Sequence, residues 1–259
     1  SLPLDVPGGN VLNPRRFPPV LRPTLRNRQP NLNYVLARDD PSHTDIISDD
    51  LVILHTQYST QWDSLAHVGS LFDADGDGHP EAVYYNGYRA GEHIHGPDAS
   101  SDCGAFDLPA IGQQSTSQAR ALGVEHMAAH CVQGRAVMID LHAHVGDARV
   151  NIDYAMLQEI IDKDQLEIAP GDMVCLHTGF AEVLLGMNRH PDGERLAASC
   201  AVLEGRDPRL LQWITESQLS VLIADNYAVE AHPASPHEDR KSTRLNSSHV
   251  SESRMPSSA

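Results

Sequence analysis

The chain has 259 residues, of which 41% are hydrophobic and 21% are charged. This composition is typical of an ordered protein with a sizeable core, and we expect one domain over residues 1–238. The formal net charge of −16 argues against nucleic acid or an anionic membrane surface as a partner. The sequence shows neither an apolar run of roughly 18 to 20 residues nor a secretory leader pattern, so a cytoplasmic location is expected.

The first fifth of the chain predicts little regular structure. Residues 1–6 alternate enough to predict an edge strand, and the Pro-, Arg- and Asn-rich residues 7–31 predict a long loop. Residues 49–54 form a short apolar run that predicts a buried strand. This strand leads directly into the most polar segment of the chain.

That segment gathers five chemically distinctive side chains within eleven residues: Gln57, Gln61, Trp62, Asp63 and His67. A single helix cannot aim them at one point, because the step from Gln61 to Asp63 turns the helix by about 200°. A fully extended strand would spread them over roughly 33 Å. A strand or loop that leads into a helix at Asp63 brings them together, with Asp63 near the N-cap.

A simpler interpretation of the same residues stays open. Asp63 is then only a helix cap and His67 only a hydrogen-bonded histidine on the first turn. Trp62 likewise either packs in the core with its N–H satisfied or lines a substrate site.

An acidic motif follows at residues 73–78, which match the opening of an EF-hand calcium loop, with Gly78 at position six. The remainder of that loop does not match. Tyr84 stands where a bidentate glutamate is required, and Pro80 stands where the second helix should form. We therefore favour an acidic surface turn over a calcium site.

The rest of the chain alternates strands and helices. The predicted order is strand 83–88, helix 123–129, strand 135–141, helix 152–163, turn 170–172, strand 173–177, an acidic and Ala-rich loop, helix 208–218 and strand 219–224. Asn151 is a candidate cap for the second helix, Pro208 suits the N1 position of the third, and Asn86-Gly87 is a strong turn pair. Asp140 and Asp225 stand at strand ends. This pattern predicts an α/β core with a site along those ends.

The last segment, residues 239–259, contains seven serines, no glycine and no aromatic residue. Its composition predicts a disordered tail. It also resembles the translation of a sequencing adapter, so we exclude it from the fold and treat it as an artefact. We expect the natural chain to continue differently beyond residue 238. We also expect the given sequence to be a fragment of it, cut at both ends.

Six ordered motifs give the chain a wider resemblance, at residues 60–68, 84–88, 137–140, 170–174, 178–180 and 224–226. Together they resemble the cyclase family of metal-dependent hydrolases, which includes kynurenine formamidase, an enzyme of tryptophan catabolism, and isatin hydrolase. The resemblance covers nearly all of residues 1–237. It implies a swivelling-type β/β/α fold, a small-molecule substrate and a homo-oligomer such as a dimer.

The family's signature is His-x-x-x-His-x-Asp-x-x-x-His, which falls here on Gln57, Gln61, Asp63 and His67. The resemblance implies that the first three positions bind a divalent metal, manganese or zinc, and that His67 transfers protons. Two ligand histidines are glutamines here, as in the longer branch of the family that carries Thr-Gln-Trp-Asp. An amide oxygen is a poorer zinc ligand than imidazole, whereas manganese tolerates oxygen-rich sites. The family also supplies a late histidine, for which His237 is the candidate, and a late glutamate that this sequence lacks.

Two functions follow as hypotheses. In the first, the protein hydrolyses a carbon–nitrogen amide bond, N-formyl or cyclic, with Asp63 and His67 as catalytic residues and Gln57, Gln61 and Trp62 contacting substrate. In the second, it is a non-catalytic protein on the same scaffold, in which Gln57 and Gln61 hydrogen-bond a small ligand.

Overall fold

The computed structural model describes residues 11–59, 61–104 and 115–231. Their contacts define two compact units, Ser1–Gln61 with Met187–Gly193, and Trp62–Gly186 with Glu194–Ala259. We describe each unit by itself. The predicted strand at residues 1–6 lies outside the described residues, and the single-domain organisation stays a prediction.

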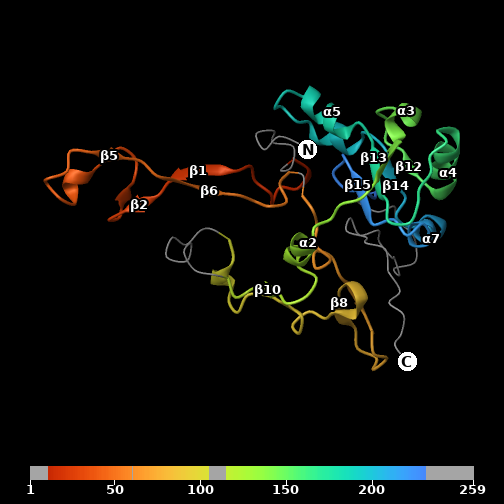
Figure 1. The fold of residues 1–259 in the computed structure, drawn as a ribbon, viewed down its shortest axis with the longest axis horizontal. Helices are drawn as coiled ribbons and strands as arrows, with labels where there is room; N and C mark the ends of the chain where they lie inside the picture. Colours follow the sequence, from red (N-terminus) through yellow and green to blue (C-terminus); the bar gives the residue numbers. More distant parts are fainter. Residues whose placement is uncertain (1–10, 60, 105–114, 232–259) are drawn as a thin grey trace. The chain divides into compact units, whose positions relative to one another are not determined.

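The first unit consists of short antiparallel strand pairs (Figure 1). Its elements are β1 (Val20–Pro23), β2 (Leu25–Arg26), β3 (Gln29–Pro30), β4 (Tyr34–Val35), the 3₁₀ helix η1 (Leu36–Arg38), β5 (Ile46–Ile47) and β6 (Asp50–Ile53). β1 pairs with β6, β2 with β3, and β4 with β5.

Two predictions for this unit need correction. The loop predicted over 7–31 contains three strands, because β6 pairs with the backbone of β1 and because β2 and β3 pair with each other. The strand predicted at 49–54 is confirmed as β6, but it is not buried, since its exposure alternates and Val52 is 58% exposed.

The second unit begins with short strands and helices before its main sheet. They are β7 (Ser70–Phe72), β8 (Glu81–Val83), η2 (Tyr85–Gly87), β9 (Ile94–His95), η3 (Ser100–Asp102), β10 (Gln118–Ala119) and α2 (Val124–His130). β7 and β8 form an antiparallel hairpin. The strand predicted at 83–88 therefore ends earlier, at Val83, while Asn86 and Gly87 form the predicted turn with φ of 53° and 82°.

The main body of this unit contains a three-stranded parallel sheet in the order β11-β13-β15. The elements are β11 (Ala136–Asp140), α3 (Leu141–Val145), β12 (Asn151–Ile152), α4 (Tyr154–Lys163), β13 (Met173–His177), α5 (Phe180–Gly186), α6 (Gly193–Ala197), β14 (Val202–Leu203), α7 (Pro208–Glu216) and β15 (Val221–Ala224). β12 and β14 form a separate parallel pair. The mixed helix and strand content agrees with the predicted α/β class, whereas the swivelling β/β/α arrangement stays a prediction.

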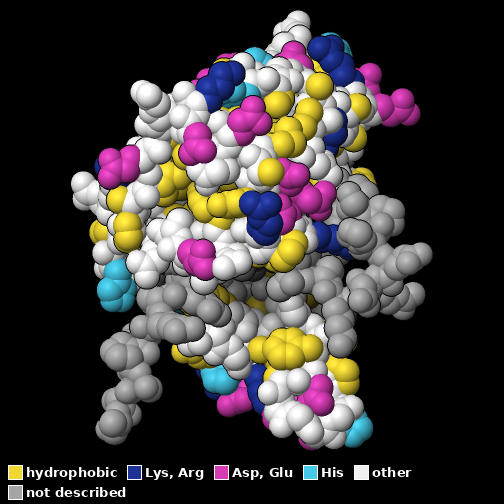
Figure 2. Space-filling model, turned by 90° about the vertical axis from the view of Figure 1, so that its right-hand side faces the viewer, with side chains coloured by type: hydrophobic (Ala, Val, Ile, Leu, Met, Phe, Trp, Pro, Cys, Tyr) yellow, Lys and Arg dark blue, Asp and Glu magenta, His cyan; other side chains and the backbone are white. Residues whose placement is uncertain are grey.

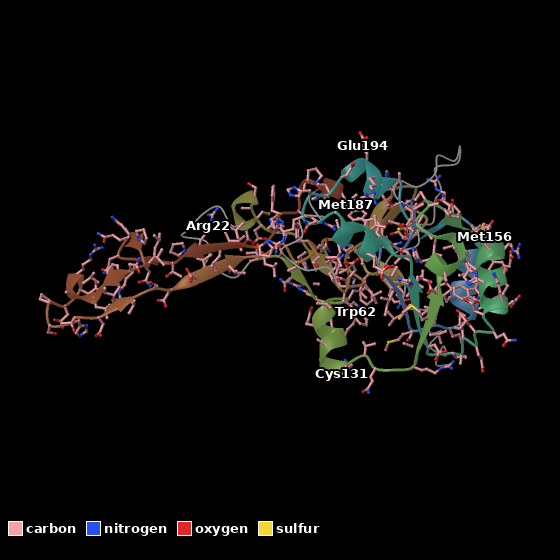
Figure 3. All side chains as sticks on the ribbon, turned by 90° about the horizontal axis from the view of Figure 1, so that it is seen from above. Arg22, Trp62, Cys131, Met156, Met187 and Glu194 are labelled. Atoms are coloured by element: carbon pink, nitrogen blue, oxygen red, sulfur yellow. The ribbon has the colours of Figure 1, made fainter. Side chains whose placement is uncertain are left out.

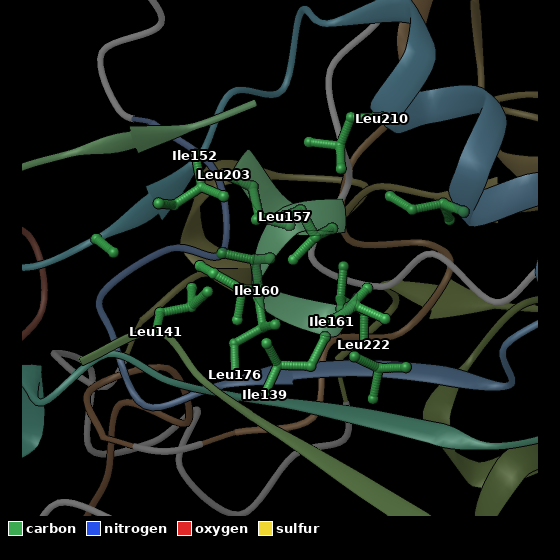
Figure 4. Close-up of a cluster of buried hydrophobic side chains, with 14 of the residues drawn as sticks. Ile139, Leu141, Ile152, Leu157, Ile160, Ile161, Leu176, Leu203, Leu210 and Leu222 are labelled. Atoms are coloured by element: carbon green, nitrogen blue, oxygen red, sulfur yellow. The ribbon is translucent and has the colours of Figure 1, made fainter. Parts of the chain in front are cut away.

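Side chains from one face of the sheet form the core with α4 and α7 (Figure 4). Ile139, Leu176 and Leu222 point into this cluster and are at most 6% exposed. On the opposite face, Met138 and Ile223 flank Cys175 in register and are 56% and 40% exposed. The apolar runs that predicted these strands thus bury mainly one face, as side-chain alternation dictates.

Local capping sets the two helices of the core. Asp207 accepts a hydrogen bond from the backbone N–H of Arg209, with Pro208 at the start of α7 as predicted. The cap of α4 is Asp153, which accepts from the N–H of Met156, rather than the predicted Asn151, which lies in β12. The loop predicted after residue 178 contains α5 and α6.

The predicted turn at residues 170–172 is anchored by a charged pair. The guanidinium of Arg135 donates to Asp172, with Nε 2.9 Å from Oδ1, and the N–H of Ala169 donates to Oδ2 at 2.7 Å. These bonds lower the pKa of Asp172 below its usual 3.8, and the bond from Arg135 has the largest effect. Gly171 completes the turn at a φ of 89°, which glycine adopts without strain.

Asp172→Asn is expected to lower the urea midpoint at neutral pH, because the folded state stabilises the ionised carboxylate. A depressed pKa means that this contribution is present above about pH 3.8 and is lost as the pH falls through the folded pKa. The difference in midpoint between wild type and variant should therefore shrink below about pH 3.8. Urea titrations followed by circular dichroism at several pH values test this, and a difference that does not change with pH contradicts it.

The distribution of charged side chains on the surface agrees with the acidic net charge of the sequence. On the face in Figure 2, Lys and Arg side chains stand apart from one another, and acidic groups lie beside several of them. Within the described residues, no helix has the length and apolarity needed to cross a bilayer.

Candidate functional site

The segment predicted to carry the chemistry spans the boundary of the two units. Gln57 and Gln61 belong to the first unit, whereas Trp62, Asp63 and His67 belong to the second. Each side chain is therefore described within its own unit, and the convergence of the glutamines with Asp63 and His67 stays a prediction. His237 lies outside the described residues.

The side chain of Gln57 is hydrogen-bonded to an arginine in the structure. The guanidinium of Arg16 donates to the side-chain Oε1 of Gln57 and to its backbone carbonyl, each at 3.1 Å. The amide oxygen is the atom that a metal ion would need, and a neighbouring positive charge opposes a second cation there. As arranged here, Gln57 does not fit a metal-ligand role. Gln61 is exposed.

The helix predicted to start at Asp63 is not present. Residues 65–66 form a turn instead, in which Ser64 accepts hydrogen bonds from the N–H groups of Ala66, at Oγ, and of His67, at the carbonyl. A helix nucleus is costly, and β7 starts at Ser70, which leaves too few residues to repay that cost. The interpretation of Asp63 as a helix cap is therefore wrong.

The turn leaves the two candidate catalytic groups in different environments. Asp63 is half-buried and His67 is exposed, so the imidazole can reach a ligand from solvent. Trp62, labelled in Figure 3, is 45% exposed, which contradicts core packing and leaves its indole available to a ligand.

A second group of polar side chains lies at the carboxyl end of the parallel sheet. Asp140 is the last residue of β11, and His177 is the last residue of β13. The two residues pair directly in the register of the parallel strands. Oδ1 of Asp140 lies 2.8 Å from Nδ1 of His177 and also accepts the N–H of Ala143, which caps α3. His142, on α3, places its ring centroid 5.6 Å from that of His177.

Neighbouring groups shift the pKa values of Asp140 and His177 in opposite directions. The hydrogen bond that the imidazole of His177 donates to Asp140 is the main cause that raises the pKa of His177, and Asp225 and Glu182 act in the same direction. Burial opposes ionisation of Asp140, but the Ala143 N–H and His177 outweigh it and lower the pKa of the carboxyl group. Both shifts favour an ion pair.

Asp225 follows β15 at the same edge of the sheet and closes the turn after β13. Its Oδ1 accepts hydrogen bonds from the backbone N–H and the hydroxyl of Thr178, both at 2.7 Å, and its Oδ2 accepts the N–H of Gly179 at 3.1 Å. Thr178 is fully buried. The hydrogen bonds of Asp225 thus have a structural role, because they fix the backbone next to His177.

Gly179 makes room for His142. Its φ is +80°, and a Cβ at this position would lie 2.5 Å from Cδ2 of the imidazole. Any larger residue would therefore displace the ring.

The sequence predicted a site along the strand ends from Asp140 and Asp225, but it did not single out His177. The usable signal was His177 as the last residue of an apolar strand, because parallel strands align their carboxyl ends.

The acidic motif forms the tip of the β7–β8 hairpin, so the favoured surface turn is confirmed. Oδ1 of Asp73 accepts the N–H groups of Gly76 and Asp77, and Oδ2 accepts that of Gly78. Strands flank the motif where an EF-hand has helices.

The chain is similar to the proteins of one known family. Residues 21–231 match the family model named Cyclase and described as "Putative cyclase". The chain belongs to the cyclase family.

One solved structure, described as the crystal structure of a novel cyclase, aligns with this chain at a TM-score of 0.56 and 23% identity. The alignment covers 88% of this chain and 63% of that one, so this chain spans less than two thirds of its length. Such a likeness shows the fold. No curated protein matches the chain.

Proposed function

We propose that this cyclase-family chain is a hydrolase that cleaves a carbon–nitrogen amide bond in a small N-formyl or cyclic amide. The observation that carries the proposal is the spacing of Gln57, Gln61, Asp63 and His67, which follows the family signature inside the matched residues 21–231. Exposed His67, in the turn that starts at Ser64, and half-buried Asp63, just before that turn, supply a proton-transfer group and a carboxylate.

In the proposed mechanism, Asp63 orients a water molecule and His67 accepts a proton from it as the oxygen attacks the amide carbonyl. His67 then returns the proton to the leaving nitrogen, and the carbon–nitrogen bond breaks to give an amine and a carboxylic acid, which releases its proton to solvent. Gln61 and Trp62 contact the substrate through an amide and an aromatic face. The proposed mechanism uses no metal, because Arg16 occupies the oxygen of Gln57.

Because the Arg16 contact argues against a metal ion at Gln57, it favours one alternative function. In that alternative the chain is a binding protein in which Gln57 and Gln61 hold a polar ligand and nothing is hydrolysed. The two functions are separated by assaying purified protein on formyl-anilide and lactam substrates while measuring bound manganese and zinc. Turnover that depends on His67 supports the hydrolase. Ligand binding without turnover supports the binding protein.

Arg16→Ala provides a test of the metal question. We expect removal of the guanidinium to free Oε1 of Gln57 and to raise the affinity for Mn²⁺ at the signature residues, because a competing positive charge is lost. Paramagnetic broadening by Mn²⁺ measures this, with Arg22→Ala as a matched control in the same unit. An unchanged affinity contradicts the role given to Arg16.

A further inference from the structure

We propose that Asp140, His142 and His177 form a binding site for a borderline divalent metal ion of the zinc class, separate from the segment 57–67. Each residue offers one ligand atom, and these atoms all lie within 4.8 Å of one another. Ligands of a tetrahedral zinc ion lie about 3.4 Å apart, so small side-chain rotations close the site.

The donor set defines the class of ion. Two imidazoles and one carboxylate are typical of zinc and of other first-row divalent metals, with further positions open to water. Calcium and magnesium prefer all-oxygen ligands, so they match this set poorly. The side chains of His142 and His177 are 34% and 32% exposed, which lets an ion enter from solvent.

Outer carboxylates also match a metal site. Asp147 lies 2.8 Å from Nε2 of His142, and Glu182 lies 3.9 Å from Nε2 of His177. Ligating imidazoles usually hold a carboxylate on their second nitrogen, which fixes the tautomer and raises ligand basicity. Three carboxylates, those of Asp140, Asp147 and Glu182, lie at these two imidazoles, and their negative charge attracts a cation.

The scaffold fixes the three ligands independently of any ion. Asp140 is oriented by the N–H of Ala143, His177 by its register in β13, and His142 by the space above Gly179. The carboxyl end of a parallel sheet is also where α/β proteins commonly bind ligands. Little ordering cost is left for binding.

The test uses the purified full chain, stripped with a chelator and titrated with Co²⁺. We expect visible d–d absorption that saturates near about one equivalent, and Zn²⁺ should abolish it by displacement. His142→Ala and His177→Ala should each weaken Co²⁺ binding by at least about tenfold. Added Zn²⁺ should raise the thermal midpoint of the wild type, but not that of either variant.

Two controls make the outcome specific. His144→Ala removes a histidine from the same helix, whose Nε2 pairs with Asp164 at 2.9 Å, and it should leave the Co²⁺ spectrum unchanged. His67→Ala should also leave it unchanged, which separates this site from the proposed hydrolase site. A wild type without d–d absorption, or His142→Ala and His177→Ala variants that keep it, would overturn the proposal.

Discussion

His67→Ala is expected to lower kcat/KM for formyl-anilide hydrolysis by about 100- to 10,000-fold, the usual range for loss of a general acid–base group. His67 is exposed and follows directly on the Ser64 turn, so removing the imidazole takes little packing from the protein. The loss should therefore fall on kcat, while the thermal midpoint stays close to that of the wild type.

A matched control is His79→Ala, which removes an exposed histidine from the tip of the β7–β8 hairpin. It should keep wild-type kcat/KM. Equal rates for wild type and His67→Ala, measured by the release of aniline, would remove His67 from the mechanism.

Asp225→Ala is expected to destabilise the fold by about 3 to 5 kcal/mol, because it leaves three donors without their acceptor. These donors are the N–H and hydroxyl of fully buried Thr178 and the N–H of Gly179. Each unsatisfied buried donor costs about 1 to 3 kcal/mol, and water can reach only part of this turn. Urea unfolding followed by circular dichroism measures the change.

Asp225→Asn separates hydrogen bonding from charge. It keeps one acceptor oxygen, so it should lose less stability than Asp225→Ala. If the alanine variant unfolds at the wild-type urea concentration, the turn after β13 does not depend on this carboxylate.

The elements that sequence predicted best have local causes. α4 and α7 follow from helical periodicity together with Asp or Pro at their starts, and β13 follows from an apolar run behind a Gly171 turn. Their energetics come from neighbouring residues, so a window of about a dozen residues contains the necessary information.

The elements that sequence missed depend on distant partners. β1 is exposed along its length, and its register joins Val20 to Ile53 of β6, so the hydrophobic pattern around residues 20–23 gives little signal. The opposite error occurred at Asp63, where the i, i+4 spacing to His67 suggested a helix that six residues before β7 cannot support.

The candidate site divides in the same way. The spacing of the family signature predicts Asp63 and His67 as site residues, because the signature is a local motif, and this stays a prediction. The Asp140–His177 contact joins residues that the register of β11 and β13 brings together, and only the three-dimensional pairing reveals it.

Hydrolysis in water labelled with oxygen-18 tests the central claim, attack of water on an amide carbonyl, most directly. We expect the purified chain to convert a formyl-anilide to aniline and to formate that carries the label, as measured by mass spectrometry, and His67→Ala to do so far more slowly. Binding of the substrate without labelled product would contradict it.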